Sequence, residues 1–363
     1  MISNVICNSA KQGLIPQREY FDKDIANSDN TNGYYIIESN DFVYNPRKSA
    51  DAPYGPISSY QYSEAGIVSP LYLCFRAKRE INPLYFEWYF RSSAWHRYIY
   101  MSGDSGARHD RVSIKDDVFF AMPINVPSAK EQERISLFLD AIERRIETQR
   151  TLVETLKKYK RGLLNKLFSN INSNIYPTVY LSEVADFLQG LTYSPSDVSV
   201  SGYLVLRSSN IQNGMLSFDD CVYVDKKVDE SLQVKCDDVI MCVRNGSKNL
   251  VGKTALIPPN MPMTTWGAFM MIIRSKLNDT YIFHYLNSQM FFSQVFKDTG
   301  TATINQITKG ILNECRLPLP PETERIQISK MLSSFDAKIQ NAEKCLATLE
   351  AYCTPYTRNL PLK

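Results

Sequence analysis

An internal repeat of two long helical segments is the feature that most constrains how this chain of 363 residues can fold. Residues 126–160 and residues 319–353 align without a gap at an offset of 193. Identical residues recur at matching places, such as Pro127 with Pro320 and Tyr159 with Tyr352. Self-similarity of this kind indicates that one structural unit occurs twice. The sequence therefore predicts an internal pseudo-two-fold repeat with the order globular, helix, globular, helix.

Each repeated segment carries an apolar stripe at alternating steps of four and three residues, which is typical of a coiled coil. Ser128 followed by Glu131 is a capping-box motif that predicts the start of the first helix. Because the two stripes match position for position, we expect the helices to pair antiparallel with each other; the alternative is that each packs only on its own domain. The predicted seam residues are Ile135, Leu139, Ile142, Ile146, Val153, Leu156, Ile328, Leu332, Phe335, Ile339, Leu346 and Leu349.

The segments before the helices contain short β-branched and aromatic runs bounded by Gly, Asn, Asp and Pro, which is typical of strands. Examples are DFVYNP, GIVSPLYLCFR, GYLVLRSS, CVYVD, DVIMCVR and GAFMMIIRS. The predicted fold class is therefore mixed, strand-rich α/β, with two tandem globular domains and two long helices. The predicted divisions are residues 1–126, 127–171, 172–319 and 320–363.

Composition argues against a membrane-spanning, a secreted or a metal-binding protein. No run of about 18 apolar residues predicts a membrane span, and the N-terminus lacks a basic stretch followed by an apolar one. We therefore expect a cytoplasmic protein without membrane contact. The net charge of +3 says little about nucleic acid, since the placement of charge matters more than its sum. The 8 cysteines show no CxxC spacing and the 3 histidines lie far apart, so no metal site is expected.

No stretch carries a complete catalytic motif. The segment GSKNLVGKT, from Gly246 to Thr254, has five residues between its glycines, whereas a P-loop has four. It is better interpreted as a turn between two strands, and an enzyme that uses it for nucleotide is the weakest hypothesis. Asn45-Pro46-Arg47 lacks the second Pro and the aromatic residue of an amino-methyltransferase motif. We therefore expect no catalytic residue.

The whole plan resembles the specificity (S) subunit of type I restriction–modification systems. The segment VPSAKEQERI, the helix that follows it and KRGLLNKLF resemble the first conserved region of that family. The runs DFVYNPRKSADAPYGPI and DVIMCVRNGSKNLVGKTALIP resemble its target-recognition domains. The resemblance covers essentially the whole chain.

The resemblance implies a non-catalytic subunit for bacterial defence that reads a bipartite, asymmetric double-stranded DNA target. Two modification (methyltransferase) subunits would dock on the helices and methylate adenine with S-adenosylmethionine. A restriction motor subunit would add cleavage driven by ATP and Mg. These cofactors are expected on the partner subunits and none on this chain.

One departure concerns the first target-recognition domain. The second unit opens at about residues 180–203, and the first unit, which opens at NVICNSAKQG, has no counterpart of that piece. The second helix also has no counterpart of KRGLLNKLF. Either the start is placed too late or the chain is a natural or engineered truncation, and we expect a sheet edge and apolar surface of the first domain to be uncovered. The alternative function is therefore a coiled-coil scaffold, or a DNA-inactive specificity subunit, that binds partner proteins only.

Polar side chains on the Gly-bounded loops are the DNA-contact candidates, because Arg and Lys bond guanine and Asn and Gln bond adenine. For each, a solvated or turn-forming role is the alternative. Trp266 is better interpreted as a core residue than as a base-stacking one. The basic run from Lys157 to Arg161 is either a solvated helix face or a contact for DNA or a methyltransferase subunit. The candidates are Lys11, Gln12, Asn45, Arg47, Lys48, Arg108, His109, Arg111, Arg207, Asn210, Arg244, Asn245, Ser247, Lys248 and Asn249.

Overall fold

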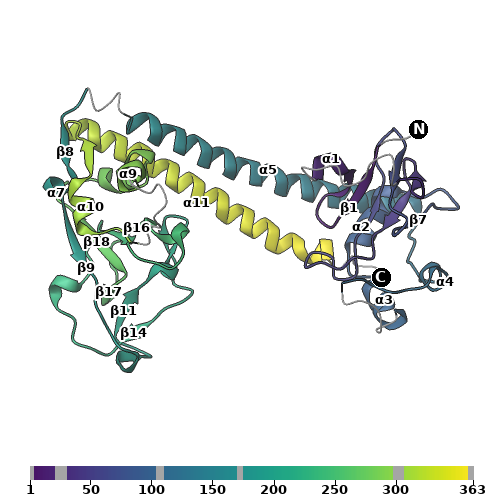
Figure 1. Ribbon diagram of the computed structural model, residues 1–363, viewed down its shortest axis with the longest axis horizontal. Helices are drawn as coiled ribbons and strands as arrows, with labels where there is room; N and C mark the ends of the chain where they lie inside the picture. Colours follow the sequence, from purple (N-terminus) through teal and green to yellow (C-terminus); the bar gives the residue numbers. More distant parts are fainter. Residues whose placement is uncertain (1–3, 21–30, 104–109, 170–174, 297–305, 359–363) are drawn as a thin grey trace. The chain divides into compact units, whose positions relative to one another are not determined.

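The computed structural model describes residues 4–20, 31–103, 110–169, 175–296 and 306–358, and the chain divides into two compact units (Figure 1). Unit 1 comprises residues 1–151 and 343–363, and unit 2 comprises residues 152–342. Both long helices contribute residues to both units, so the division falls within the helices. The mixed α/β content agrees with the predicted fold class.

Unit 1 contains small antiparallel sheets whose described strands pair as β1–β2, β3–β6 and β5–β4–β7. Its elements before the first long helix are β1 (Ile6–Ser9), β2 (Gly13–Pro16), α1 (Gln17–Tyr20), β3 (Tyr35–Ile37), β4 (Phe42–Tyr44), β5 (Ile57–Ser59), β6 (Gly66–Val68), β7 (Leu73–Phe75), α2 (Pro83–Arg91), α3 (His96–Ser102) and α4 (Asp116–Phe120).

Unit 2 is built on two four-stranded sheets, β16–β15–β18–β9 and β10–β14–β11–β17, in which only β11 and β17 run parallel. Two further pairs are β12–β13 and β19–β8. The elements are β8 (Thr178–Tyr180), α7 (Leu181–Val184), β9 (Ala185–Gln189), η1 (Pro195–Asp197), β10 (Val198–Ser199), β11 (Tyr203–Leu206), η2 (Ser208–Asn210), β12 (Ile211–Gln212), β13 (Met215–Leu216), β14 (Tyr223–Val224), η3 (Glu230–Leu232), β15 (Val239–Cys242), η4 (Lys248–Leu250), β16 (Thr254–Leu256), β17 (Thr264–Trp266), β18 (Met270–Ser275), α8 (Tyr281–Leu286), α9 (Gln289–Val295), α10 (Lys309–Glu314) and β19 (Arg316–Pro318).

The repeat extends to the sheets, because β5–β4–β7 of unit 1 has the same plan as β16–β15–β18 of unit 2. A carboxylate just before the central strand pairs with an arginine of the outer strand region in both units. Asp41 accepts from Arg76 at 2.9 Å, and Asp238 accepts from Arg274 at 2.7 Å. A glycine with positive φ, Gly55 at 82°, precedes β5, and a Cβ there would meet the Asn45 carbonyl oxygen at 2.1 Å. Gly252 takes the same position before β16 with φ 87°.

The long helices are α5 (Ala129–Leu167) and α11 (Glu322–Arg358). Glu131 accepts from the Ser128 backbone N–H at 3.0 Å, so the predicted helix start is confirmed. Every predicted seam residue is buried or half-buried, and Leu139, Val153, Leu332 and Ile339 are the buried ones. No helix in the described part of the chain is long and apolar enough to cross a membrane.

The two helices contact each other within each unit. In unit 1, Arg150 of α5 pairs with Glu350 of α11 at 2.8 Å. In unit 2, the rings of Tyr159 and Phe335 lie 5.4 Å apart and Lys160 forms an ion pair with Asp336. Farther along α5, Leu164 joins a core cluster with Leu332 of α11.

Candidate nucleic-acid interface

A concave hollow of about 950 Å³ gathers most of the predicted DNA-contact residues of unit 1. It is lined by the β1–β2 turn, the loop that follows β4, and Arg111. We call it the unit 1 hollow. Six of the eight predicted residues line it, although the sequence separates them by up to 100 positions. They are Lys11, Gln12, Asn45, Arg47, Lys48 and Arg111.

Local hydrogen bonds explain how the loop after β4 presents its cations. The Asn45 side chain accepts from the Arg47 backbone N–H at 3.1 Å and donates to the Asn8 carbonyl at 3.1 Å, so it holds the turn. The backbone N–H of Lys48 donates to the Asp110 carbonyl at 2.9 Å. With the backbone fixed in this way, the side chains of Arg47 and Lys48 are exposed.

Three further points concern the residues of unit 1. Lys11 forms a 3.5 Å ion pair with Asp51, but both side chains are mostly exposed, so the pair is weak and solvent-screened. Arg108 and His109 lie outside the described residues. Tyr20 and Tyr72 also line the hollow and were missed by the sequence analysis. In the sequence, each is an aromatic residue next to a polar loop. A single sequence does not distinguish such a residue from an aromatic residue of the core.

Arg244 of unit 2 occupies the position that Arg47 occupies in unit 1. Each arginine follows the central strand of its sheet and forms an isolated antiparallel bridge with a residue from the segment before the next helix, Arg111 for Arg47 and Gln306 for Arg244. Arg244 is exposed and lies over the ring of Phe269 at 5.4 Å. Phe269 is itself 59% exposed and was missed by the sequence analysis. An exposed cation stacked on an exposed ring suits contact with phosphate or a base.

The structure corrects the prediction that Asn210 contacts DNA. It is fully buried, its amide donates to the carbonyls of Ser217 and Asp220 at 3.0 Å each, and its oxygen accepts from the Arg207 backbone N–H at 2.9 Å. All its hydrogen-bonding groups serve the turn, so it is a structural residue. Arg207 is also engaged, since it pairs with Asp220 at 2.8 Å.

The remaining predicted residues of unit 2 lie on the loop after Arg244. The Asn245 amide donates to the Ser208 hydroxyl at 3.1 Å and its oxygen accepts from the Ser247 backbone N–H at 2.9 Å. Ser247 and Asn249 are exposed. The side chain of Lys248 lies outside the described part of the structure. This loop connects β15 to β16, so the interpretation of GSKNLVGKT as a turn between strands is confirmed.

The structure also places Trp266 and the basic run of α5, and it leaves both interpretations of the basic run open. Trp266 is fully buried and its indole N–H donates to the Leu188 carbonyl at 3.2 Å, so it belongs to the core. On α5, Lys157, Lys158 and Arg161 are exposed, whereas Lys160 pairs with Asp336.

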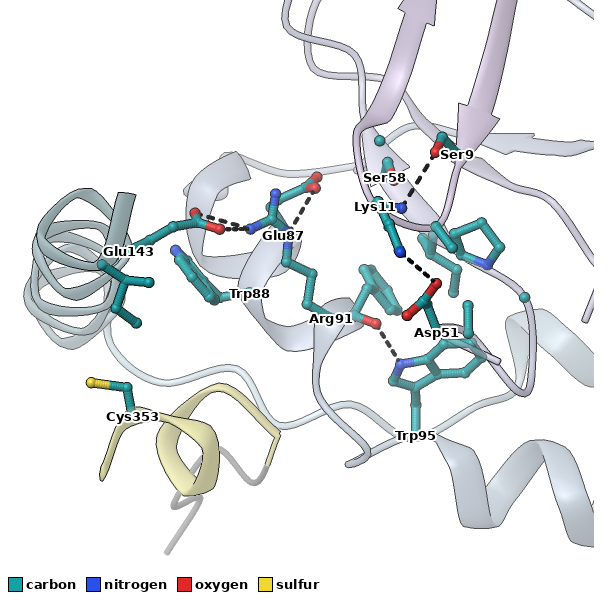
Figure 2. Close-up of a pocket in the computed structure, with 18 of the residues that line it drawn as sticks. Ser9, Lys11, Asp51, Ser58, Glu87, Trp88, Arg91, Trp95, Glu143 and Cys353 are labelled. Atoms are coloured by element: carbon teal, nitrogen blue, oxygen red, sulfur yellow. Dashed lines mark hydrogen bonds and ion pairs between the residues drawn. The ribbon is translucent and has the colours of Figure 1, made fainter. Parts of the chain in front are cut away.

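A second hollow of unit 1, of about 420 Å³, is lined by side chains that neutralise one another (Figure 2). Arg91 lies between Glu87 at 3.4 Å and Glu143 at 3.0 Å. The Trp95 indole N–H donates to the Phe90 carbonyl at 2.9 Å. Lys11 also lines this hollow and pairs with Asp51, and Arg150 pairs with Glu147 and Glu350. The described Lys and Arg side chains of this hollow are thus each engaged by a carboxylate.

Residues 176–351 match the model of the type I restriction modification DNA specificity domain. The match covers most of unit 2 together with the first part of α11. The chain is also similar to type I specificity subunits of known organisms. The chain is 28% identical over 171 residues to the EcoKI specificity subunit of Escherichia coli K12, which covers 45% of this chain and 36% of that protein. Residues 176–351 are therefore a type I restriction modification DNA specificity domain, and the chain as a whole resembles type I specificity subunits.

The chain is also similar to a specificity subunit of lower identity. The MjaVIII specificity subunit of Methanocaldococcus jannaschii is 24% identical over 249 residues, covering 62% of this chain and 58% of that protein. The chain thus spans between about a third and three fifths of the length of these relatives.

Solved structures show the same fold. A chain from a structure describing assembly and conformational transition of the type I R-M system matches with a TM-score of 0.57 and 18% identity, covering 89% of this chain and 83% of that one. The type I S subunit from M. genitalium matches with a TM-score of 0.53 and 15% identity, covering 92% of this chain and 86% of that one.

Proposed function

We propose that this chain reads a bipartite, asymmetric DNA target, with one half-site for each unit. The observation that carries the proposal is the equivalent placement of Arg47 and Arg244. Each is an exposed arginine on the loop that leaves the central strand of a repeated sheet. Arginine can bond guanine bidentately or hold a phosphate. Since the two loops differ in every neighbouring side chain, the two half-sites have different sequences.

The unit 1 hollow supports the same proposal from its shape and charge. It combines exposed cations with amide side chains and two tyrosine rings on a concave surface. Phosphate contacts from cations position a duplex, and amide or guanidinium contacts to base edges specify sequence. We therefore assign Arg47 and Lys48 to base or phosphate contact in the first half-site, and Arg244, Ser247 and Asn249 to the second.

The helices are the proposed docking element for two modification subunits. The contacts between α5 and α11 inside each unit support an antiparallel coiled coil as the spacer element between the two predicted target-recognition domains. The exposed cations Lys157, Lys158 and Arg161 of α5 suit an acidic face of a modification subunit or the unread DNA spacer. The methyl-donor chemistry, and any ATP-driven cleavage by a restriction subunit, belong to those partners.

Mapping of adenine methylation across a genome tests this function, with the chain expressed beside its cognate modification subunit. We expect a motif of two specified halves separated by an unspecified spacer, methylated on both strands and lost when the chain is omitted. A motif with one half only would place the reading in a single unit.

The alternative is a scaffold that binds partner proteins and does not read DNA. It is favoured by strand β7 of unit 1, which among the described strands pairs only with β4, whereas β18 of unit 2 is flanked on both sides. A stable complex with the modification subunit that leaves the genome unmethylated would support the scaffold and contradict DNA reading.

A further inference from the structure

An isolated antiparallel bridge in unit 1 joins the loop after β4 to the segment before α4, with Arg47 opposite Arg111. The backbone N–H of Val112 donates to the carbonyl of Pro46 at 2.9 Å. Arg47 and Arg111 therefore form the non-hydrogen-bonded type of pair, in which the Cα atoms of opposite residues lie about 4.5 Å apart. Side chains of such a pair lie on the same face and are neighbours. The bridge thus presents two side chains together, although they lie far apart in the sequence.

Unit 2 repeats this bridge with one side chain exchanged. Arg244 lies opposite Gln306, and the backbone N–H of Ile307 donates to the carbonyl of Val243 at 2.7 Å, as in the bridge of unit 1. Gln306 therefore occupies the position of Arg111. The backbone frame is the same in the two units, while the side chain opposite the shared arginine is a cation in unit 1 and an amide in unit 2.

The side chains of this bridge in unit 2 are available for a ligand. Gln306 is exposed, and its amide forms no hydrogen bond with any residue that the structure describes. Among the same residues, the guanidinium of Arg244 has no carboxylate partner and lies over the ring of Phe269 at 5.4 Å. By contrast, Arg207 pairs with Asp220 at 2.8 Å. The hydrogen-bonding groups of Arg244 and Gln306 are thus not used to hold the described fold.

Both side chains line a hollow of about 280 Å³, which we call the unit 2 hollow. Phe269 contributes a ring that is 59% exposed, and Lys309 adds an exposed cation. Gln189 also lines the hollow, but its amide donates to the carbonyl of Ala268 at 2.9 Å and so serves the chain. An exposed ring, two cations and the unengaged amide of Gln306 suit a nucleic acid base and its phosphate.

The hydrogen-bonding groups of Gln and Arg select different purines. The Gln amide has a donor and an acceptor group, which match N7 and the N6 amino group of adenine in the major groove. The Arg guanidinium has donors only, and it matches N7 and O6 of guanine. Successive nucleotides lie about 3.4 Å apart along a duplex. Two neighbouring side chains of this length can therefore reach neighbouring base pairs.

We propose that Gln306 reads an adenine in the unit 2 half-site, next to a guanine that Arg244 reads. The side chain opposite the shared arginine sets the base at this place, so Arg111 reads a guanine at the equivalent place of the unit 1 half-site. The proposal rests on the proposed function, since it names the bases that the two bridges read. It adds Gln306, which the sequence analysis missed, to the specificity-determining residues.

The Gln306→Arg variant tests the proposal in the full chain bound to its cognate modification subunit. The complex is used to select duplexes from a library whose target positions are randomised. We expect one position of the unit 2 half-site to change its preferred base from adenine to guanine. The preference should shift at least about fivefold, the lower end of what one bidentate contact gives. Selection by binding is the readout, because exchange of the methylated adenine itself would abolish a methylation signal.

Two further variants complete the experiment. Arg111→Gln is the reciprocal exchange, and it should change one guanine to adenine in the unit 1 half-site only. Gln289→Arg is the matched control, since Gln289 is an exposed glutamine of α9 that does not line the unit 2 hollow. It should leave both half-sites unchanged. Thermal unfolding verifies that all three variants fold.

The outcomes distinguish failure of this proposal from failure of the proposed function. If the wild-type complex selects a bipartite target and Gln306→Arg selects the same target, Gln306 reads no base and the proposed function stands. Equal weakening on every duplex would also overturn the proposal, since Gln306 would then contact the sugar–phosphate backbone. A change confined to the unit 1 half-site would contradict the equivalence of the two bridges. If the wild-type complex selects no target, both proposals fail.

Discussion

At the scale of single residues, His284 is a fully buried titratable side chain of unit 2. It lies on α8, its Nε2 lies 3.4 Å from the Ser333 hydroxyl, and its Nδ1 lies 4.0 Å from Asp336, which is already paired with Lys160. Burial, reinforced by the positive charge of Lys160, lowers the pKa of His284 from 6.5 to about 3. The imidazole is therefore neutral in the folded chain at neutral pH.

The stability of unit 2 should consequently fall as pH falls below 6.5. In that range the unfolded chain binds a proton at His284 and the folded chain does not, until pH approaches 3. The cost from this group is about 1.4 kcal/mol for each pH unit. Urea unfolding at pH 7.0 and pH 5.5 is the measurement, and His284→Asn should lose part of this difference. An unchanged pH difference in the variant would contradict the assignment.

The sequence predicted which types of side chain lie on the loops better than it predicted whether each one faces solvent or holds a turn. Arg47 and Arg244 could be chosen because a cation on a Gly-bounded loop is exposed in most folds. Asn210 has the same sequence signature, but its amide is consumed by two carbonyls that the sequence places 7 and 10 residues away. Phe269 was overlooked because an aromatic residue beside a strand usually packs in the core. Which polar group serves a turn is decided by the tertiary path of the chain.

At the scale of elements, a face packed against a core stabilises the long helices more than intrinsic propensity does. Leu332 of α11 is 0% exposed and belongs to the cluster that contains Leu164 and Phe168 of the α5 segment. The long helices were predictable from their apolar stripe, and β15 and β18 were predictable as apolar runs bounded by turn residues. The short pairs β12–β13 and β10–β14 have two residues in each strand, which is too short for any period to show.

Leu332→Ala should therefore destabilise the chain by about 2–5 kcal/mol, the usual cost of a cavity in a core. Its neighbour Met331 is 39% exposed, and Met331→Ala should change the free energy of unfolding by less than about 0.5 kcal/mol. Urea denaturation followed by helical circular dichroism compares the two. Equal effects would show that this face of α11 does not pack as described.

At the scale of the whole molecule, the internal repeat gives the two units the same sheet plan. The same three-stranded plan, the same Asp–Arg pair and the same glycine before the strand that follows the central one (β5 and β16) occur in both units. The loops that leave the central strands nevertheless differ in sequence. A conserved frame with divergent loops is how one fold carries two different specificities. The repeat was visible in the sequence, whereas the gathering of Lys11, Asn45 and Arg111 around one hollow was not, because it depends on long-range strand pairing.

The most direct test of the central claim is the methylated motif produced by two variants, Arg47→Ala and Arg244→Ala, each expressed with the modification subunit. Loss of a base contact removes about 1–3 kcal/mol of discrimination. We predict that Arg47→Ala relaxes or abolishes recognition in one half-site only and that Arg244→Ala does so in the other half-site only. Lys226→Ala, a control at an exposed cation of unit 2 outside the loop, should leave the motif unchanged. If both arginine variants altered the same half-site, or neither altered the motif, the claim that each unit reads its own half through this loop would be wrong.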